Sequence, residues 1–209
     1  MYIPALNRQD DPETLLAFMQ RNNFATLVSQ LEGQLIASHI PVVVTHAGEA
    51  FYISGHLAKA NPHVQALNSE LLVIFTGPHA YISPQHYDST QNVPTWNYTA
   101  VHAYGQPETL RFGDKPQDLT GDISELIAQH EAAYQQQWDS LSERYRHGML
   151  QGVVGFRMQV TRLEGKYKLS QNRSNTEQHR IIDALKRHPD TDISGVAELM
   201  AEQSDADKD

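Results

Sequence analysis

Cysteine is absent from the 209 residues of this chain. Without thiols the chain cannot form disulfides, thiolate metal sites, iron–sulfur clusters or a cysteine nucleophile. Basic residues are also few, because 16 lysines and arginines are outnumbered by 25 acidic residues, which gives a formal net charge of -9. This balance argues against a general binder of polyanions, since nucleic-acid modules usually carry a dominant basic face.

Long apolar runs are missing as well. No stretch approaches the roughly 18 residues of a membrane span, and the N-terminal sequence MYIPALNRQDDPE lacks the charged and then apolar layout of a signal peptide. We therefore expect a cytoplasmic protein without a membrane partner. A hydrophobic content of 40% is typical of a globular chain that buries one core.

Several catalytic and nucleotide-binding motifs are also absent. The sequence contains no GxSxG, no P-loop and no GxGxxG fingerprint, which argues against an α/β-hydrolase, a P-loop ATPase and a Rossmann domain. The eleven histidines raise a metal or haem hypothesis, but none pairs at a metal-ligand spacing and HExxH does not occur. An axial haem ligand needs no spacing, so haem binding stays an alternative.

The hydrophobic pattern predicts short strands with few helices between them. We expect a first helix at Pro12 capped by Asp11, a hairpin turn at Glu32 and Gly33, and strands at 25–30, 34–44, 49–55, 70–77, 98–112 and 152–171. Because β-α-β alternation is lacking, the fold class is mainly β with peripheral helices (α+β), built as an antiparallel barrel. The expected organisation is a barrel domain over 1–172 with a helical excursion at about 117–150, helices packed on it over 173–200, and a disordered acidic tail over 201–209.

The stretch KYKLSQNR (166–173) concentrates three cations, a serine and two amides in an acidic chain. If it is a strand, alternation places Lys166, Lys168, Ser170 and Asn172 on one face. Such a row of donors suits a phosphate or another oxyanion. The alternative is a solvated edge strand, in which lysines discourage aggregation.

Three further segments at predicted strand ends are rich in polar and aromatic residues: GHLAKANPH (55–63), GPHAYISPQHY (77–87) and VPTWNY (93–98). Strand ends converge in a barrel, so distant segments can line one pocket. VPTWNY joins a proline, a hydroxyl, an indole and an amide, a combination that can hold a flat heteroaromatic ring. The alternative is that Trp96 is a core anchor.

These segments, together with MYIP at the N-terminus and SHIP at 38–41, resemble the PaiB family. That family is described as FMN-binding negative transcriptional regulators, within the split-barrel flavoproteins related to pyridoxamine phosphate oxidase. The likeness covers about residues 1–200. It departs from the family pattern at His86, where tryptophan is expected before Tyr87.

The resemblance implies a split β-barrel that forms a homodimer, with two equivalent FMN sites built from both subunits. It points to Lys59 and Lys168 as phosphate partners, and to Thr95, Trp96 and the nearby amides as contacts of the ring or ribityl chain. The full set of candidate cofactor-binding residues is Ser54, His56, Lys59, Tyr81, Ser83, Thr95, Trp96, Asn97, Lys168, Gln171 and Asn172. No catalytic residue and no metal ligand is predicted.

The resemblance leaves three functions to separate. In the first, the flavin is either the redox cofactor of an FMN-dependent oxidoreductase or a sensed ligand linked to negative transcriptional regulation. The sequence shows no acid-base residue that would decide between these two roles of the flavin. The second is a DNA-binding repressor, supported weakly by Arg180, Lys186 and Arg187. The third is a haem-binding or haem-degrading split-barrel protein.

Overall fold

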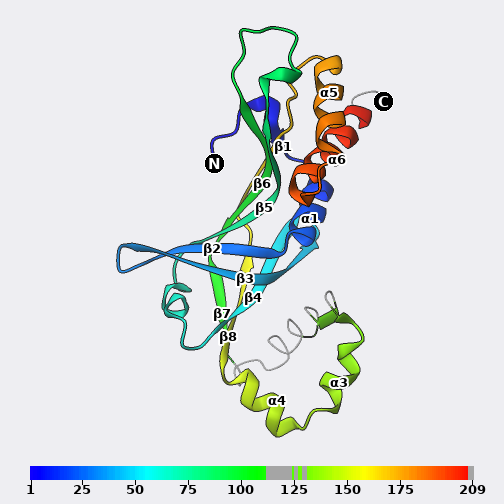
Figure 1. The fold of residues 1–209 in the computed structure, drawn as a ribbon. Helices are drawn as coiled ribbons and strands as arrows, with labels where there is room; N and C mark the ends of the chain where they lie inside the picture. Colours follow the sequence, from blue (N-terminus) through cyan, green and yellow to red (C-terminus); the bar gives the residue numbers. More distant parts are fainter. Residues whose placement is uncertain (112–123, 125–126, 129–130, 207–209) are drawn as a thin grey trace. The chain divides into compact units, whose positions relative to one another are not determined.

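The structure is a computed structural model that describes residues 1–111, 124, 127–128 and 131–206 (Figure 1). Two compact units share the chain. Unit 1 contains Met1–Leu15, Thr76–Val101 and Glu164–Asp209, and unit 2 contains Leu16–Phe75 and His102–Leu163. Each unit is therefore assembled from segments that are far apart in the sequence.

The described residues form a nine-stranded antiparallel sheet with the order β1-β9-β6-β5-β2-β3-β4-β8-β7. Its strands are β1 (Arg8–Gln9), β2 (Phe24–Leu31), β3 (Gln34–Ala47), β4 (Ala50–Ala58), β5 (Leu71–Ile82), β6 (Thr95–Gly105), β7 (Pro107–Leu110), β8 (Val153–Gln159) and β9 (Arg162–Lys168). This arrangement confirms the predicted antiparallel, mainly β fold with peripheral helices.

The helices precede, connect and follow the strands. They are η1 (Ala5–Asn7), α1 (Pro12–Arg21), η2 (Pro62–Ala66), η3 (Pro84–His86), α3 (Tyr134–Ser140), α4 (Glu143–Leu150), α5 (Asn175–Leu185) and α6 (Thr191–Ala206). The predicted cap of α1 is present, because the Thr14 N–H donates to the Asp11 carboxylate at 2.8 Å. Within the described part of the chain, no helix is both long enough and apolar enough to cross a membrane.

The β2–β3 hairpin of unit 2 turns where the sequence predicts. Glu32 and Gly33 both have positive φ angles, 51° and 81°, as a two-residue type I′ turn requires. Pairing with β2 ends at Pro41, and pairing of β3 with β4 begins at Val42. Pro41 thus marks a change of partner strand, because proline has no N–H to donate to a ladder.

Two predicted strands are each divided in the structure. The strand predicted over 98–112 separates into β6 and β7 around Gln106, and the one over 152–171 separates into β8 and β9. At the first division Gly105 is required, because a Cβ there would lie 2.3 Å from the Gln159 carbonyl oxygen. The requirement for glycine next to the break therefore comes from the close approach of the Gln159 backbone, which hydrophobic alternation does not reveal.

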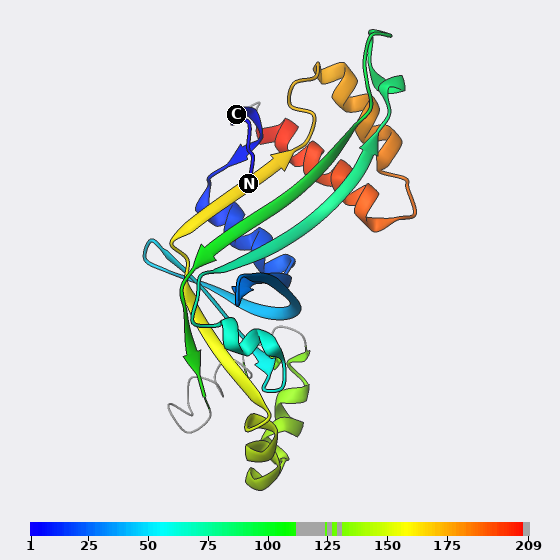
Figure 2. The same cartoon turned by 90° about the vertical axis from the view of Figure 1, so that its left-hand side faces the viewer.

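In unit 1, α5 and α6 cover one face of the strands (Figure 2). The core they form with β5 and β9 contains Ala80, Ile82, Tyr87, Leu169, Ile181, Leu185, Val196, Ala197 and Met200. Ile182 and Leu199 pack at its edge. The apolar residues of the C-terminal helices are therefore used for packing within unit 1.

The predicted disordered tail is wrong over residues 201–206. Helix α6 continues to Ala206, while residues 207–209 lie outside the described residues. Burial of Val196 and Met200 holds the helix to unit 1, and each further residue then costs little because helix propagation is easier than initiation. Of the predicted excursion at about 117–150, helices α3 and α4 are described, and residues 117–123, 125–126 and 129–130 lie outside the described residues.

Candidate functional site

The candidate residues fall into two groups. Ser54, His56 and Lys59 belong to unit 2, on β4 or just after it. The others belong to unit 1, at the end of β5, the start of β6 and the end of β9: Tyr81, Ser83, Thr95, Trp96, Asn97, Lys168, Gln171 and Asn172. Each group is therefore described within its own unit.

An aromatic surface in unit 1 consists of His79 and Tyr81 on β5 and Trp96 on β6. The Tyr81 and Trp96 ring centroids are 6.1 Å apart in an edge-to-face arrangement at 78°, and the His79 ring lies 6.1 Å from Trp96. Tyr81 is 51% exposed and Trp96 is 53% exposed. Trp96 is therefore not a core anchor, and the rings present flat apolar area to solvent.

Lys168 connects the end of β9 to the first residues of β6. Its Nζ donates to the Trp96 carbonyl oxygen at 2.8 Å and to the Thr95 hydroxyl oxygen. Burial lowers the pKa of Lys168, the nearby Lys166 cation lowers it further, and Tyr98 acts in the opposite direction. The ammonium group therefore holds the backbone of Trp96, the residue whose ring belongs to the aromatic surface.

The predicted row of donors does not extend beyond Lys168. Strand β9 ends there, and Ser170 has a positive φ of 63°, so the alternation that would place Ser170 beside Lys168 is broken. The Ser170 hydroxyl turns inward, donating to the Asn97 amide oxygen at 3.1 Å and accepting from the Asn97 amide at 2.9 Å. Asn97 is fully buried on the helix side of β6, opposite to Trp96.

Gln171 and Ser83 are engaged in local structure. Gln171 accepts from the Leu169 N–H at 2.8 Å and donates to the Tyr167 carbonyl oxygen. Ser83 caps η3, with its hydroxyl oxygen accepting from the Gln85 N–H. Asn172 is exposed.

Lys166 is the second cation of β9, and its role is structural. It is buried, donates from Nζ to the Tyr2 carbonyl oxygen at 3.1 Å, and lies 5.0 Å from the Tyr98 ring centroid. A buried cation satisfied by a carbonyl and an aromatic face contributes to packing. The spacing of Lys166 and Lys168 in the sequence indicates that they lie on the same strand. It does not reveal that Lys166 bonds to Tyr2 whereas Lys168 bonds to Thr95 and Trp96.

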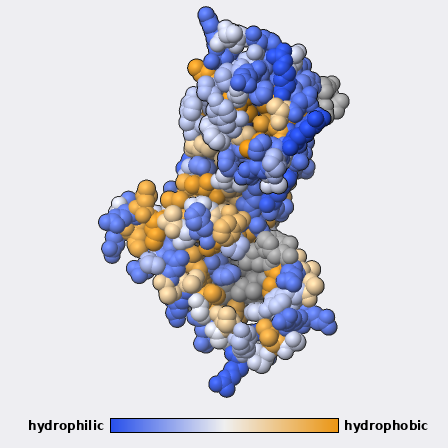
Figure 3. Space-filling view, viewed as in Figure 1, coloured by the Kyte–Doolittle hydropathy of each residue, from blue (hydrophilic) through white to orange (hydrophobic). Residues whose placement is uncertain are grey.

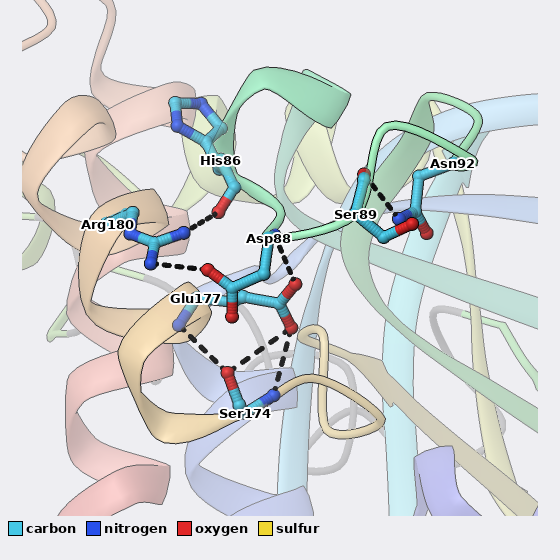
Figure 4. Close-up of polar contacts among 7 residues, drawn as sticks. All are labelled: His86, Asp88, Ser89, Asn92, Ser174, Glu177 and Arg180. Carbon is cyan, nitrogen blue, oxygen red and sulfur yellow. Dashed lines mark hydrogen bonds and ion pairs between the residues drawn. The ribbon is translucent and has the colours of Figure 1, made fainter.

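A polar latch joins the segment 86–92 to the start of α5 (Figure 4). The Glu177 carboxylate accepts from the Asp88 N–H at 2.9 Å and from the Ser174 N–H at 3.2 Å, completing a capping box. Arg180 donates to the Asp88 carboxylate at 2.6 Å and to the His86 carbonyl oxygen at 3.0 Å. His86 thus contributes its carbonyl to the latch, and the Arg180 cation is already paired.

The latch gives a prediction for acid stability. The Asp88 N–H lowers the pKa of Glu177, so this group stabilises the fold above its unfolded pKa of about 4.3 and loses that effect as the pH falls through its folded pKa. We expect the urea midpoint of the unmodified chain to fall more between neutral and acid pH than that of Glu177→Gln. Glu198→Gln, at an exposed carboxylate of α6, is the control. Parallel acid losses in the chain and in Glu177→Gln would contradict this role.

In unit 2, two histidines near the candidate residues differ in their hydrogen bonding. His63 is fully buried and both ring nitrogens are engaged, Nε2 with Ser29 at 2.9 Å and Nδ1 with Ser38 at 3.0 Å. In contrast, Nδ1 of His56 is buried with no hydrogen-bond partner among the described residues, and burial lowers the pKa of this imidazole. Because buried polar atoms are normally paired, this nitrogen is a departure from the usual pattern among the described residues of β4.

A cationic pocket of about 190 Å³ lies in unit 2 beside Lys59. Its lining residues are Lys59, Arg111, Leu150, Gln151, Val153 and Val154. The Lys59 backbone is fixed, since its N–H donates to the Gly152 carbonyl oxygen at 2.8 Å. Two cations and an amide around one hollow suit an anion such as a phosphate. Arg111 was missed by the sequence analysis, because nothing in TLRF marks it as a neighbour of Lys59.

Solved structures with similar folds share little sequence with this chain. A flavocytochrome from Azotobacter vinelandii has a TM-score of 0.57 at 13% identity, covering 76% of this chain and 68% of that chain. An FAD and heme binding protein from Mycobacterium smegmatis has a TM-score of 0.56 at 15% identity, covering 78% and 73%. This likeness confirms the split-barrel fold.

Sequence comparison gives a more specific result. Residues 1–162 match the family model described as "Putative FMN-binding domain". The protease synthase and sporulation protein PAI 2 of Bacillus subtilis is 36% identical over 205 residues, covering 97% of this chain and 98% of that protein. The resemblance to PaiB is thereby confirmed. The chain belongs to the FMN-binding domain family, and the family description carries the predicted cofactor, FMN.

Proposed function

We propose that this chain is an FMN-binding protein of the PaiB type and that the cationic pocket of unit 2 binds the phosphate of FMN. The observation that carries the proposal is the presence of Lys59 and Arg111 in one pocket of a chain with a net charge of -9. A phosphate that is close to a dianion at neutral pH would accept charge-assisted hydrogen bonds from both. His56, with its unpartnered Nδ1, lies on β4 just before Lys59.

We also propose that the aromatic surface of unit 1, taken by itself, binds the flat ring of a flavin. The exposed Trp96 and Tyr81 rings offer area for a flat ring, and Lys168 holds the Trp96 backbone in position. When bound, a flavin supplies its own electron chemistry, and the protein contributes binding, orientation and tuning. The flavin itself is therefore what supports either a redox role or a role in ligand sensing, and we propose that the chain has one of these two roles.

Flavin titration tests the proposed function directly. Adding FMN to the purified chain should shift and sharpen the flavin absorption bands and quench its fluorescence, and riboflavin should bind more weakly because it lacks the phosphate. A chain that changes neither signal at micromolar FMN would overturn the proposal.

Haem binding is a second candidate, favoured by the buried, unpartnered Nδ1 of His56. A neutral imidazole nitrogen is a haem ligand, and the lowered pKa of His56 favours the neutral form. Adding haemin should produce a sharp Soret band that His56→Ala removes. A flavin spectrum without such a band would favour FMN alone.

We also propose that the protein is a cytoplasmic homodimer. Large apolar side chains are exposed in both units, among them Val93 at 75% and Leu35 at 81%, and Figure 3 shows hydrophobic area on the β2–β3 hairpin that carries Leu35. In an isologous dimer the same patch of each subunit lies in the interface, so one interface buries the exposed apolar area of both subunits. Light scattering should report about twice 23.6 kDa at micromolar concentration. A species of 23.6 kDa alone would count against the dimer.

A regulatory role would act through the flavin or a partner protein in this proposal. Two of the three cations expected to support DNA binding are engaged, because Arg180 of α5 pairs with Asp88 and Lys186, just after α5, pairs with Asp183. With an acidic net charge, the isolated chain should not bind a promoter fragment specifically.

A further inference from the structure

A second pocket lies in unit 1, and Gln171 is the one candidate cofactor-binding residue among those that line it. Its volume is about 240 Å³. It is bounded by β1, the first turn of α1, β9 and the C-terminal part of α6, and Figure 2 shows β1 beside β9. Its lining residues are Arg8, Gln9, Thr14, Tyr167, Leu169, Gln171, Leu199, Glu202 and Gln203.

The lining combines one cation, one anion and several neutral polar groups. Arg8 comes from β1 and Glu202 from α6, so the opposite charges are on different elements. The Arg8 Nε lies 3.9 Å from the Asp10 carboxylate, which is longer than a hydrogen bond. Burial and the Glu202 charge both raise the pKa of Tyr167, so its phenol stays neutral.

Parts of the pocket wall are held in place by the protein itself. Gln171 is fixed by its bonds to the Leu169 N–H and the Tyr167 carbonyl oxygen. The Gln9 amide oxygen accepts from the Asp11 N–H at 2.9 Å, which orients its side chain. A ligand would therefore meet side chains that have already lost much of their rotational freedom.

The charges restrict the ligand that the pocket can take. A simple anion would meet the Glu202 carboxylate, and a simple cation would meet the Arg8 guanidinium, so neither matches the whole lining. A small molecule with both charges satisfies both groups. The apolar side chains of Leu169 and Leu199 offer a place for a short aliphatic group, and the volume is below the ~300–1,000 Å³ of pockets for larger ligands.

We propose that this pocket binds a small zwitterion, specifically an α-amino acid with an aliphatic side chain. Its carboxylate pairs with Arg8, its ammonium group pairs with Glu202, and its side chain rests on Leu169 and Leu199. The pocket is on the opposite face of β9 from Lys168, because Tyr167 and Lys168 are consecutive strand residues. Amino-acid binding is thus independent of the proposed flavin contacts and can be measured without flavin.

Isothermal titration calorimetry on the full chain tests this proposal, with L-leucine as the probe. Two analogues separate the charges: 4-methylpentanoate lacks the ammonium group, and 3-methylbutylamine lacks the carboxylate. We expect L-leucine to bind and both analogues to bind at least tenfold more weakly, since each loses a charge-assisted hydrogen bond. Absence of binding at millimolar L-leucine would overturn the proposal.

Variants then assign each charge to its partner. Arg8→Ala and Glu202→Gln should each weaken L-leucine binding about tenfold or more, and Glu202→Gln should not weaken 4-methylpentanoate. Arg187→Ala and Glu198→Gln, at exposed positions of unit 1 outside the pocket, are the matched controls. Far-ultraviolet circular dichroism checks that the variants fold. Unchanged L-leucine affinity in folded Arg8→Ala or Glu202→Gln would refute the assignment.

Discussion

Replacing Lys59 and Arg111 together with alanine is expected to lower the affinity for FMN by roughly a hundredfold or more. Each cation should donate a hydrogen bond to the phosphate, typically worth ~1.5–3 kcal/mol, and every ~1.4 kcal/mol is a factor of ten in affinity. Riboflavin has no phosphate, so its affinity should barely change. Fluorescence quenching of the two flavins, titrated in parallel, measures the difference.

Arg21→Ala is the matched control for this experiment. Arg21 is an exposed cation of unit 2 at the end of α1, and it does not line the cationic pocket. It should leave both affinities unchanged. If the double variant bound FMN and riboflavin more weakly by the same factor, Lys59 and Arg111 would not contact the phosphate. If neither affinity changed, the cationic pocket would not be part of the flavin site.

Replacing Lys168 with methionine is expected to weaken FMN and riboflavin alike, by about tenfold to a hundredfold. The change removes the ammonium group but keeps most of the stem, so the Trp96 carbonyl and the Thr95 hydroxyl lose their donor. Loss of a hydrogen bond from a charged group is worth ~1.5–3 kcal/mol, and here the loss would displace the backbone that carries the Trp96 ring. The same parallel titration with both flavins provides the measurement.

The outcome also decides between two roles for Lys168. A fall for FMN alone would place its ammonium group at the phosphate, as the row of donors in KYKLSQNR first indicated. If neither flavin responded, this segment would be a solvated strand end. Lys186→Met, at the exposed cation that follows α5, provides the comparison for a general effect of charge.

The sequence predicted local features well where one or two residues control the backbone. Glu32 and Gly33 form the expected turn because few residues tolerate positive φ, and Asp11 caps α1 because its carboxylate reaches the first turn. The antiparallel fold class also followed from the sequence, because strands without intervening helices cannot form a parallel sheet.

Features that depend on contacts between distant residues were not predictable in the same way. The requirement for glycine at Gly105 results from the approach of the Gln159 backbone, and the continuation of α6 past Met200 follows from burial. The face on which a side chain lies was also misjudged at Ser170, because a positive φ ends the strand alternation. None of these causes is visible in a local pattern.

The sequence by itself determined the family, the flavin cofactor and the segments that carry the candidate site, because motifs and composition are local properties. Only the tertiary structure decided how those residues are used. In the structure Asn97 is buried against Ser170, and Trp96 and Tyr81 are exposed. Lys59 and Arg111 line the same pocket. The physical reason is that burial, ion pairing and hydrogen bonding depend on which distant segments meet, and that meeting is fixed by the packing of the whole unit.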